Sequence, residues 1–238
     1  MPSSNAIETA YTQRRGEIQT YFDRTAVEAW KRFATQAPLG RIRATVREGR
    51  ARMRALMLSR LPDDLSGWRV LDAGCGTGAM SVELARRGAD VLGIDLAPEI
   101  IRFAQETLPA DIGPGRITFA AGDMLSRDHG EFDAVVAMDS LIHYQMNDSI
   151  AALGSLASRT RQGIVFTFAP RTPALAAMHT MGRLFPRSDR APSIVPVRPD
   201  AMRSGLEAEL PATIWQTGHT QRISHGFYTS QMLELVRP

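Results

Sequence analysis

The stretch Val70-Leu71-Asp72-Ala73-Gly74-Cys75-Gly76-Thr77-Gly78 decides the fold expected of this chain of 238 residues. It joins a short apolar run at 68–73, typical of a buried strand, to a helix-forming run at 79–87. Dinucleotide sites space their glycines as G-x-G-x-x-G, so that a pyrophosphate can sit on the helix N-terminus. Here the third glycine comes one residue early, and Asp72 stands two residues before the first glycine. An acidic side chain there disfavours a pyrophosphate and suits a ligand with an ammonium group, which S-adenosylmethionine carries.

Strand and helix signals alternate after this loop, as they do in a parallel α/β sheet. Further strand-like runs lie at 90–94, 116–120, 132–138 and 163–168, and helical runs lie at 98–108 and 149–158. A helical stretch at 173–184 follows, and then two strand-like runs at 212–218 and 226–236. The pattern predicts an α/β, Rossmann-like fold whose mostly parallel, seven-stranded sheet ends in an antiparallel C-terminal hairpin.

The same pattern divides the chain into four regions. We expect an N-terminal helical arm or lid at 1–61, a Rossmann-like S-adenosylmethionine-binding core at 62–169, a substrate lid inserted after strand five at 170–211, and C-terminal strands at 212–238. Pro192, Pro196 and Pro199 argue against a continuous helix in the insertion and favour a loop or lid there.

Charge is distributed unevenly along the chain. The formal net charge is +3, but residues 1–61 carry twelve basic against five acidic side chains, a net of +7, and residues 62–168 carry eight against fifteen, a net of −7. A helix expected at 41–61 places four arginines on one stripe, at i, i+4, i+7 and i+11: Arg43, Arg47, Arg50 and Arg54. The stripe is either a solvated helix face or a basic wall above an active-site mouth. An acidic centre between basic flanks argues against a general nucleic-acid scaffold and for a smaller anion or a membrane surface.

Composition limits the compartment and the chemistry. Cys75 is the only cysteine, which excludes an intramolecular disulfide framework, a cysteine zinc cluster and a CxxC redox site. We predict no metal ligands. The N-terminus lacks the apolar core of a signal peptide, and no apolar run approaches the ~18 residues of a transmembrane helix. We therefore expect a cytoplasmic protein whose membrane contact is peripheral.

Acidic residues follow two further strands of the expected sheet. Asp95 ends the second strand, where a carboxylate accepts hydrogen bonds from ribose hydroxyls. Asp123 follows the third strand, where its carboxylate could accept the adenine amino group while the Met124 backbone N–H meets a ring nitrogen. The predicted cofactor contacts from these strand ends and the glycine loop are Asp72, Gly74, Gly76, Gly78, Asp95, Leu96, Asp123, Met124 and Asp139. Cys75 is expected to be a small packed side chain.

The fourth strand leads into Asp139-Ser140-Leu141-Ile142-His143-Tyr144. Residues just beyond such a strand face the ligand crevice of an open α/β sheet, so we expect His143 and Tyr144 beside the sulfonium methyl group. The segment lacks the [DN]-P-P-[YF] element of enzymes that methylate base amines. Nucleic acid is therefore a weak substrate class.

These residues together resemble the magnesium protoporphyrin IX methyltransferases of chlorophyll and bacteriochlorophyll synthesis, which are class I S-adenosylmethionine-dependent enzymes. The resemblance covers most of the chain and includes the Leu-Ile-His-Tyr of 141–144. Its other elements are Tyr-Phe at 21–22, Glu-Ala-Trp-Lys at 28–31, Val-Arg-Glu-Gly at 46–49, the loop at 72–78, Phe-Ala-Pro-Arg-Thr at 168–172, Leu-Phe-Pro at 184–186 and Gly-Phe-Tyr at 226–228. This chain departs from the family at two places. It has Ala26-Val27 where the family typically has Gly-Phe, and Arg50 where the family often has His.

The resemblance implies methyl transfer from S-adenosylmethionine to one propionate of Mg-protoporphyrin IX, with Tyr21 and His143 as the catalytic residues. Trp30, Arg43 and Tyr144 would contact the porphyrin, and Arg47 would meet the cofactor carboxylate. Contact with the magnesium chelatase and peripheral association with the photosynthetic membrane are further expectations. Coordination of magnesium by His143 is disfavoured, because Mg²⁺ prefers oxygen donors.

Two rival functions share parts of this pattern. A small-molecule O- or C-methyltransferase of quinone or polyketide synthesis would share the loop at 72–78 but not the combination of Tyr21 with the 141–144 segment. A noncatalytic module that binds S-adenosylmethionine or a nucleotide is the rival of another class. Formation of a monomethyl ester from Mg-protoporphyrin IX would distinguish a porphyrin methyltransferase from both rivals.

Overall fold

The computed structural model describes residue 16, residues 41–171 and residues 194–238, with the backbone alone at 41–43. Tyr21 and Trp30 and the helical stretch expected at 173–184 lie outside the described residues, as does the side chain of Arg43.

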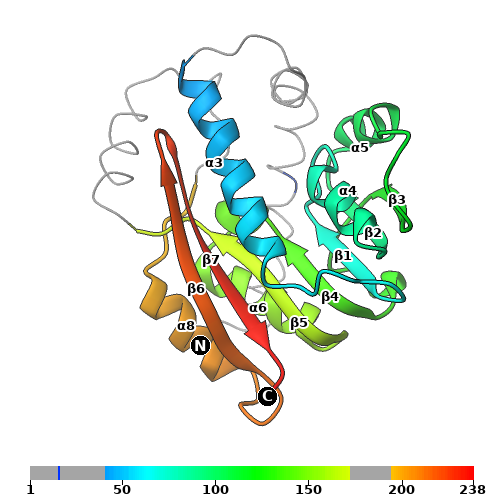
Figure 1. Cartoon of the computed structure of the whole chain (residues 1–238). Helices are drawn as coiled ribbons and strands as arrows, with labels where there is room; N and C mark the ends of the chain where they lie inside the picture. The colour runs from blue at the N-terminus through cyan, green and yellow to red at the C-terminus, as the bar shows by residue number, and fades with distance from the viewer. Residues whose placement is uncertain (1–15, 17–40, 172–193) are drawn as a thin grey trace.

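A seven-stranded sheet forms the centre of the molecule (Figure 1). Its strands in chain order are β1 (Arg69–Ala73), β2 (Asp90–Asp95), β3 (Arg116–Ala121), β4 (Phe132–Ala137), β5 (Thr160–Phe168), β6 (Gln216–His225) and β7 (Tyr228–Val236). The spatial order is β3-β2-β1-β4-β5-β7-β6. The first five strands pair in parallel, and β7 pairs antiparallel with both β5 and β6. The predicted fold class is confirmed.

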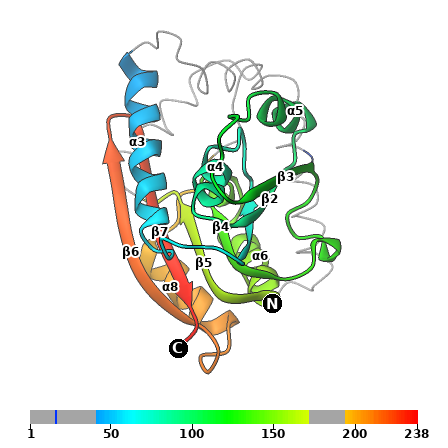
Figure 2. The same cartoon turned by 45° about the vertical axis from the view of Figure 1, so that its right-hand side comes forward.

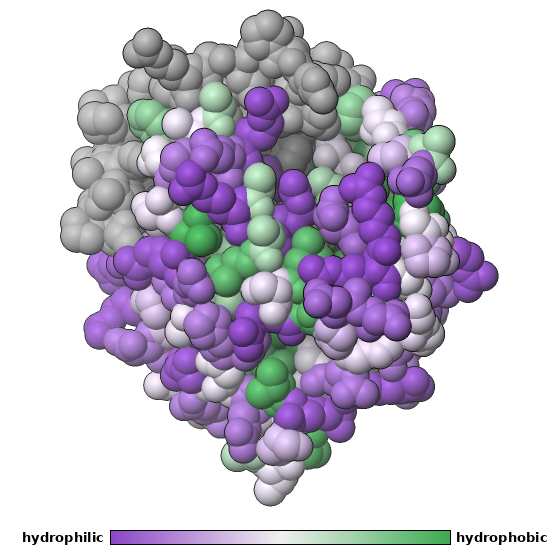
Figure 3. Space-filling view, in the orientation of Figure 1, coloured by the Kyte–Doolittle hydropathy of each residue, from purple (hydrophilic) through white to green (hydrophobic). Residues whose placement is uncertain are grey.

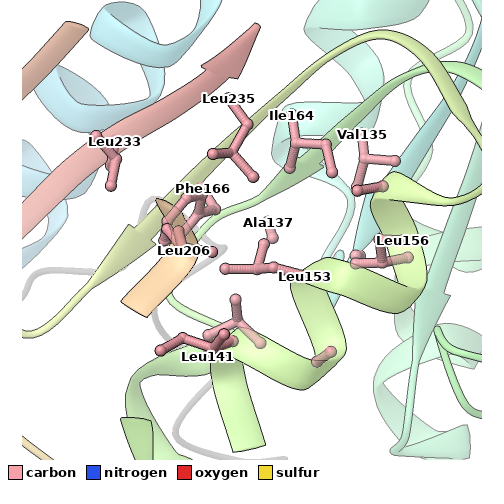
Figure 4. Close-up of a cluster of buried hydrophobic side chains, with 14 of the residues drawn as sticks. Val135, Ala137, Leu141, Leu153, Leu156, Ile164, Phe166, Leu206, Leu233 and Leu235 are labelled. Atoms are coloured by element: carbon pink, nitrogen blue, oxygen red, sulfur yellow. The ribbon is translucent and has the colours of Figure 1, made fainter. Parts of the chain in front are cut away.

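Helices cover both faces of the sheet (Figures 1 and 2). They are α3 (Arg41–Leu58), α4 (Ala79–Arg86), α5 (Pro98–Glu106), α6 (Met146–Ala157) and α8 (Pro199–Glu209). Helices α6 and α8 pack on one face, whose buried side chains include Val135, Ile164 and Leu233 (Figure 4). On the other face, helices α3 and α4 pack over the alternate residues of the same strands, such as Val136 and Val165. Strands buried on both faces explain the near-continuous apolar runs in the sequence.

The loop expected at the end of the insertion is wrong for residues 199–209, which form helix α8. Pro199 occupies the first turn of this helix, where its missing N–H costs nothing. Met202 and Leu206 are fully buried against the α6 face. Proline therefore marks a helix start here.

Strand β6 begins later than the sequence suggests. The run predicted at 212–218 starts with a turn, in which the backbone N–H groups of Ile214 and Trp215 donate to the Pro211 carbonyl, and the strand spans Gln216–His225. Most β6 side chains are exposed, because this strand is the edge of the sheet. An edge strand of polar residues has no apolar run to reveal it.

The described surface is mostly polar on the face that carries α3 (Figure 3). Its exposed large apolar side chains are Ile214 and Phe227. Among the described residues, every helix is too short or too polar to span a bilayer.

Candidate active site

A cavity of about 550 Å³ lies where β1, β2 and β4 end, beneath α3. This is the size of a pocket for a small molecule or cofactor. Among the predicted cofactor and substrate contacts, the described ones that line it are Arg47, Asp72, Gly74, Gly76, Asp95, Leu96, Asp123, Met124, Asp139, His143 and Tyr144. The structure therefore brings these together, whereas Gly78 lies outside the lining. No described residue of 194–211 lines the cavity.

The glycine loop takes a conformation that other residues rarely adopt. The φ angles of Gly74, Gly76 and Gly78 are 78°, 54° and 79°. A Cβ at Gly74 would lie 2.3 Å from the Ser140 Cβ, and a Cβ at Gly78 would lie 2.4 Å from the Phe119 ring. Gly74 thus lets the β1 and β4 ends approach each other. Gly78 serves packing at the start of α4, which explains why it is needed without facing the cavity.

Asp72 is a buried acid at the base of this loop. Its side chain is 1% exposed, and its Oδ2 accepts a hydrogen bond of 2.6 Å from Ser81 Oγ. Burial raises the pKa of Asp72 to about 7, and the nearby charge of Asp95 adds to the increase, while Ser81 opposes it. The carboxyl group is therefore poised between its neutral and charged forms near neutral pH.

Asp95 and Asp123 hold backbone at two strand ends. Asp95 accepts hydrogen bonds of 3.0 Å from the backbone N–H groups of Gly76 and Ala97. Asp123 accepts one of 2.9 Å from Leu125 N–H. Both residues also line the cavity, so they organise the wall that a ligand there would contact. Cys75 is buried, and burial raises the pKa of its thiol, which makes it a packed side chain as expected.

Asp139 has a role that the sequence did not reveal. It has a φ of 55°, uncommon outside glycine. Its carboxylate accepts hydrogen bonds from Tyr228 OH at 3.2 Å, Ser230 Oγ at 3.1 Å and Thr167 Oγ1 at 3.2 Å, and it pairs with Arg50 Nε at 3.3 Å. The residue predicted as a cofactor contact therefore joins β4, β5, β7 and α3. A separation of 89 residues between Asp139 and Tyr228 hides this contact from any local pattern.

His143 and Tyr144 lie side by side in the chain at the cavity wall. Leu141–His143 form a 3-10 turn, which the Tyr144 N–H closes onto the Leu141 carbonyl at 3.2 Å. Tyr144 is 4% exposed and belongs to the α6-side core, and His143 is half-buried. The Oγ of Ser140, one of the cavity-lining residues, is buried without a hydrogen-bond partner in the described part of the chain.

Three arginines of α3 line the cavity: Arg47, Arg50 and Arg54. Of the two interpretations of the arginine stripe, the basic wall therefore holds for these three residues. Helix α3 lies close to the sheet because Gly49 meets the Tyr228 ring, where a Cβ would come within 2.6 Å of a ring atom. Sequence reasoning did not single out Gly49, although a glycine inside an amphipathic helix often marks such a close approach.

Comparison with known proteins identifies relatives that match nearly the whole chain. Residues 137–237 match a family model described as magnesium-protoporphyrin IX methyltransferase C-terminus, and residues 70–163 match one described as methyltransferase domain. The magnesium-protoporphyrin O-methyltransferase of Rhodobacter capsulatus is 47% identical over 225 residues, which are 94% of this chain and 97% of that protein.

A sequence and a crystal structure from Synechocystis extend the comparison. A magnesium-protoporphyrin O-methyltransferase is 30% identical over 92% of this chain and 95% of its own length. The crystal structure of magnesium protoporphyrin IX methyltransferase with bound SAH has a TM-score of 0.78 and 28% identity, covering 94% of this chain and all of that one. By fold, by the cavity and by similarity along nearly its whole length, the chain belongs to the magnesium-protoporphyrin O-methyltransferase family.

Proposed function

We propose that this protein transfers a methyl group from S-adenosylmethionine to a propionate carboxylate of Mg-protoporphyrin IX, forming the monomethyl ester and S-adenosylhomocysteine. The observation that carries the proposal is similarity over nearly the whole chain, including the family-specific match at 137–237 that contains His143 and Tyr228. A quinone-type methyltransferase is disfavoured, because that match extends beyond the cofactor domain.

The chemistry of the cavity fits S-adenosylmethionine. Asp72 supplies a buried acid for a cationic group, Asp95 and Asp123 supply acceptors for hydroxyl and amino groups, and Gly74 keeps the loop free of side chains. The buried Ser140 Oγ adds an unused polar atom at the same wall. When bound, this cofactor supplies a methyl group on a positively charged sulfur.

The protein needs little acid-base chemistry for this reaction. A propionate should have a pKa near the ~4.3 of glutamate, so it is already a nucleophile at neutral pH. The residues around it act by holding the carboxylate oxygen in line with the methyl carbon, which can lower a barrier by ~7–11 kcal/mol. Exclusion of water adds to this, because the reacting charges cancel as the ester forms.

We assign the orientation of the reacting propionate to hydrogen bonds from His143 and Tyr21. His143 lines the cavity next to Tyr144, which supports its part of the assignment. Tyr21, Trp30 and Arg43 enter the proposal from the family resemblance, with Trp30, Arg43 and Tyr144 on the porphyrin side. The arm at 1–61 and the insertion at 170–211 would cover the macrocycle.

A flat, largely apolar porphyrin is poorly soluble, which favours its delivery at a surface. We therefore include peripheral membrane contact and handover from the magnesium chelatase in the proposal. The net charge of +7 over residues 1–61 and Phe227, 55% exposed at the β6–β7 turn, support a membrane contact. Binding to anionic vesicles and to purified chelatase subunits tests the two contacts, and absence of sedimentation or capture would remove the corresponding one.

The decisive experiment mixes the protein with methyl-labelled S-adenosylmethionine and Mg-protoporphyrin IX. We expect labelled monomethyl ester in amounts that exceed the enzyme many times. Cofactor binding without ester would favour a noncatalytic module. Label on a quinol or phenol acceptor in a parallel reaction, with no ester from Mg-protoporphyrin IX, would favour the quinone-type rival.

A further inference from the structure

Arg54 is one of the three arginines of α3 that line the cavity. It lies on the side of α3 that faces α4, and it lines the cavity with Asp72, Met80 and Glu83. Within the described structure its guanidinium makes no hydrogen bond or salt bridge. Burial lowers the pKa of Arg54, while the charges of Glu83 and Asp72 act in the opposite direction. A guanidinium that is largely removed from water normally has a partner, so half-buried Arg54, which has none among the described residues, is suited to an anionic ligand in the cavity.

Neighbouring arginines of the same helix show the contrast. Arg50 pairs with Asp139, and Arg52 pairs with Glu48 at 2.5 Å on the solvent side. Just past the helix, Arg60 pairs with Glu234 at 2.7 Å. Arg47 lines the cavity but is exposed, so water satisfies it.

We propose that Arg54 binds the amino-acid carboxylate of the methyl donor, while Asp72 faces its ammonium group. The inference rests on the proposed function, and it moves to Arg54 a contact that the sequence led us to expect of Arg47. In an amino acid the carboxylate and the ammonium group are attached to one carbon atom. A partner for the carboxylate must therefore adjoin the partner of the ammonium group.

The position of Arg54 meets this condition. Arg54 is the arginine whose charge acts on Asp72, and both residues line the same cavity wall beside the glycine loop. The charge of Glu83 also acts on Arg54 and favours the charged guanidinium. The pair of unlike charges thus matches a zwitterion, which neither a neutral quinol nor an isolated phosphate presents.

The experiment compares two ligands by isothermal titration calorimetry. S-adenosylhomocysteine carries the amino-acid group, whereas 5′-methylthioadenosine has the same nucleoside and sulfur without it. Arg54→Met should weaken S-adenosylhomocysteine binding about ten- to hundredfold, as expected for loss of a hydrogen bond between charged groups, and should change 5′-methylthioadenosine binding less than about twofold. Arg54→Lys should recover part of the loss.

Arg52→Met is the matched control, since it removes a charge from the same helix on the solvent side, and it should bind both ligands like the unchanged protein. Equal weakening of both ligands by Arg54→Met, or no weakening of either, would overturn the proposal. A selective loss in Arg47→Met instead would return the contact to Arg47. If Arg54→Met fails to fold, Arg54→Gln carries the same comparison, because it also removes the charge.

Ester formation by the unchanged protein is measured separately. Absence of ester together with a selective loss in Arg54→Met would reject the proposed substrate and leave the Arg54 assignment standing. Ester formation without a selective loss would reject the assignment alone.

Discussion

At the scale of single residues, the acids at the strand ends differ in burial and therefore in their tendency to take up a proton near neutral pH. Asp95 and Asp123 are half-buried and accept hydrogen bonds from backbone N–H groups, whereas Asp72 is fully buried with Ser81 as its hydrogen-bond donor. The pKa of Asp72 is therefore raised to about 7 by burial. This makes the cofactor pocket sensitive to pH through one identified group.

Affinity for S-adenosylhomocysteine should fall as the pH is lowered from 8 to 6. An ammonium group on the ligand favours charged Asp72, so below about pH 7 binding must release the proton that the free protein holds. The loss can reach about tenfold per pH unit for one proton. Calorimetry across this range measures it. Asp72→Asn should bind more weakly with a flat profile, and an equal slope in both proteins would contradict the assignment.

Replacing His143 with alanine should lower turnover by about 10²-fold or more and leave S-adenosylhomocysteine affinity within a few fold. The reason is that the proposed hydrogen bond orients the substrate carboxylate, and misplacement of a reacting group by about 1 Å can cost this much. Single-turnover kinetics and calorimetry provide the two measurements. Unchanged turnover would remove His143 from the mechanism.

Gly74→Ala and Gly67→Ala form a pair that separates backbone strain from crowding. Their φ angles, 78° and 79°, are nearly equal, but a Cβ at Gly67 would meet nothing within 4 Å. Gly67→Ala should cost about 1–2 kcal/mol of unfolding free energy. Gly74→Ala should cost about 1–3 kcal/mol more, because its Cβ collides with Ser140, and should also abolish cofactor binding. Urea unfolding tests the pair. Equal losses of unfolding free energy would show that Ser140 and the end of β4 move away from the added methyl group without cost.

At the scale of elements, the docking of helix α3 is decisive for the site. Gly49 lies against the Tyr228 ring, Gly226 lies against Thr45, and Glu48 meets His225 Nε2 at 2.9 Å. The C-terminal hairpin thus holds α3 over the cavity. Tyr228 also donates to Asp139, and burial next to that carboxylate raises the pKa of the phenol far above its usual range. The hydroxyl therefore stays protonated and donates at every working pH.

A glycine-to-alanine change should have opposite effects in two helices. Alanine favours a helix interior by about 0.5–1 kcal/mol, and at Gly154 of α6 its Cβ would meet only the flexible Glu209 side chain at 3.4 Å. Gly154→Ala should therefore raise the melting temperature. Gly49→Ala should lower it and weaken S-adenosylhomocysteine binding, since the Tyr228 ring must move away from α3. Thermal unfolding with and without ligand tests this, and stabilisation by Gly49→Ala would show that α3 docks loosely.

At the scale of the whole molecule, the cavity lies between the sheet, α3 and the segment after β4, so a ligand there binds elements that are distant in the sequence. Such a ligand stabilises the folded state against all of its unfolded forms. The uneven charge of the chain follows the same division, with the net −7 of residues 62–168 in the cofactor sheet and arginines of the +7 segment above the cavity.

Saturating S-adenosylhomocysteine should raise the melting temperature by several degrees. At a hundredfold excess over the dissociation constant the added stability is about 2.7 kcal/mol, and a domain of 150–250 residues gains about 2–4 °C for each kcal/mol. Differential scanning fluorimetry measures the shift. Gly74→Ala is the matched control, and a shift of the same size in that variant would place the ligand outside the described cavity.

The sequence by itself determined the order of strands and helices, the glycine loop and the acids at the strand ends. These features are local: apolar runs, a glycine pattern and side chains that directly follow buried strands. For that reason the sequence could predict the fold class and which loop and strand-end residues would meet at one edge of the sheet. Helix α8 and the start of β6 could not, because a proline and an exposed edge strand mislead local patterns.

Only the tertiary structure decided which cavity residues have a partner in the protein and which face a ligand. The Asp139 carboxylate accepts hydrogen bonds from Tyr228 and Ser230, which lie about ninety residues further along the chain. Arg50 has a carboxylate partner while Arg54, one helical turn later, has none among the described residues. Hydrogen bonding and burial depend on neighbours that folding brings from distant segments, and a spacing pattern carries no information about them.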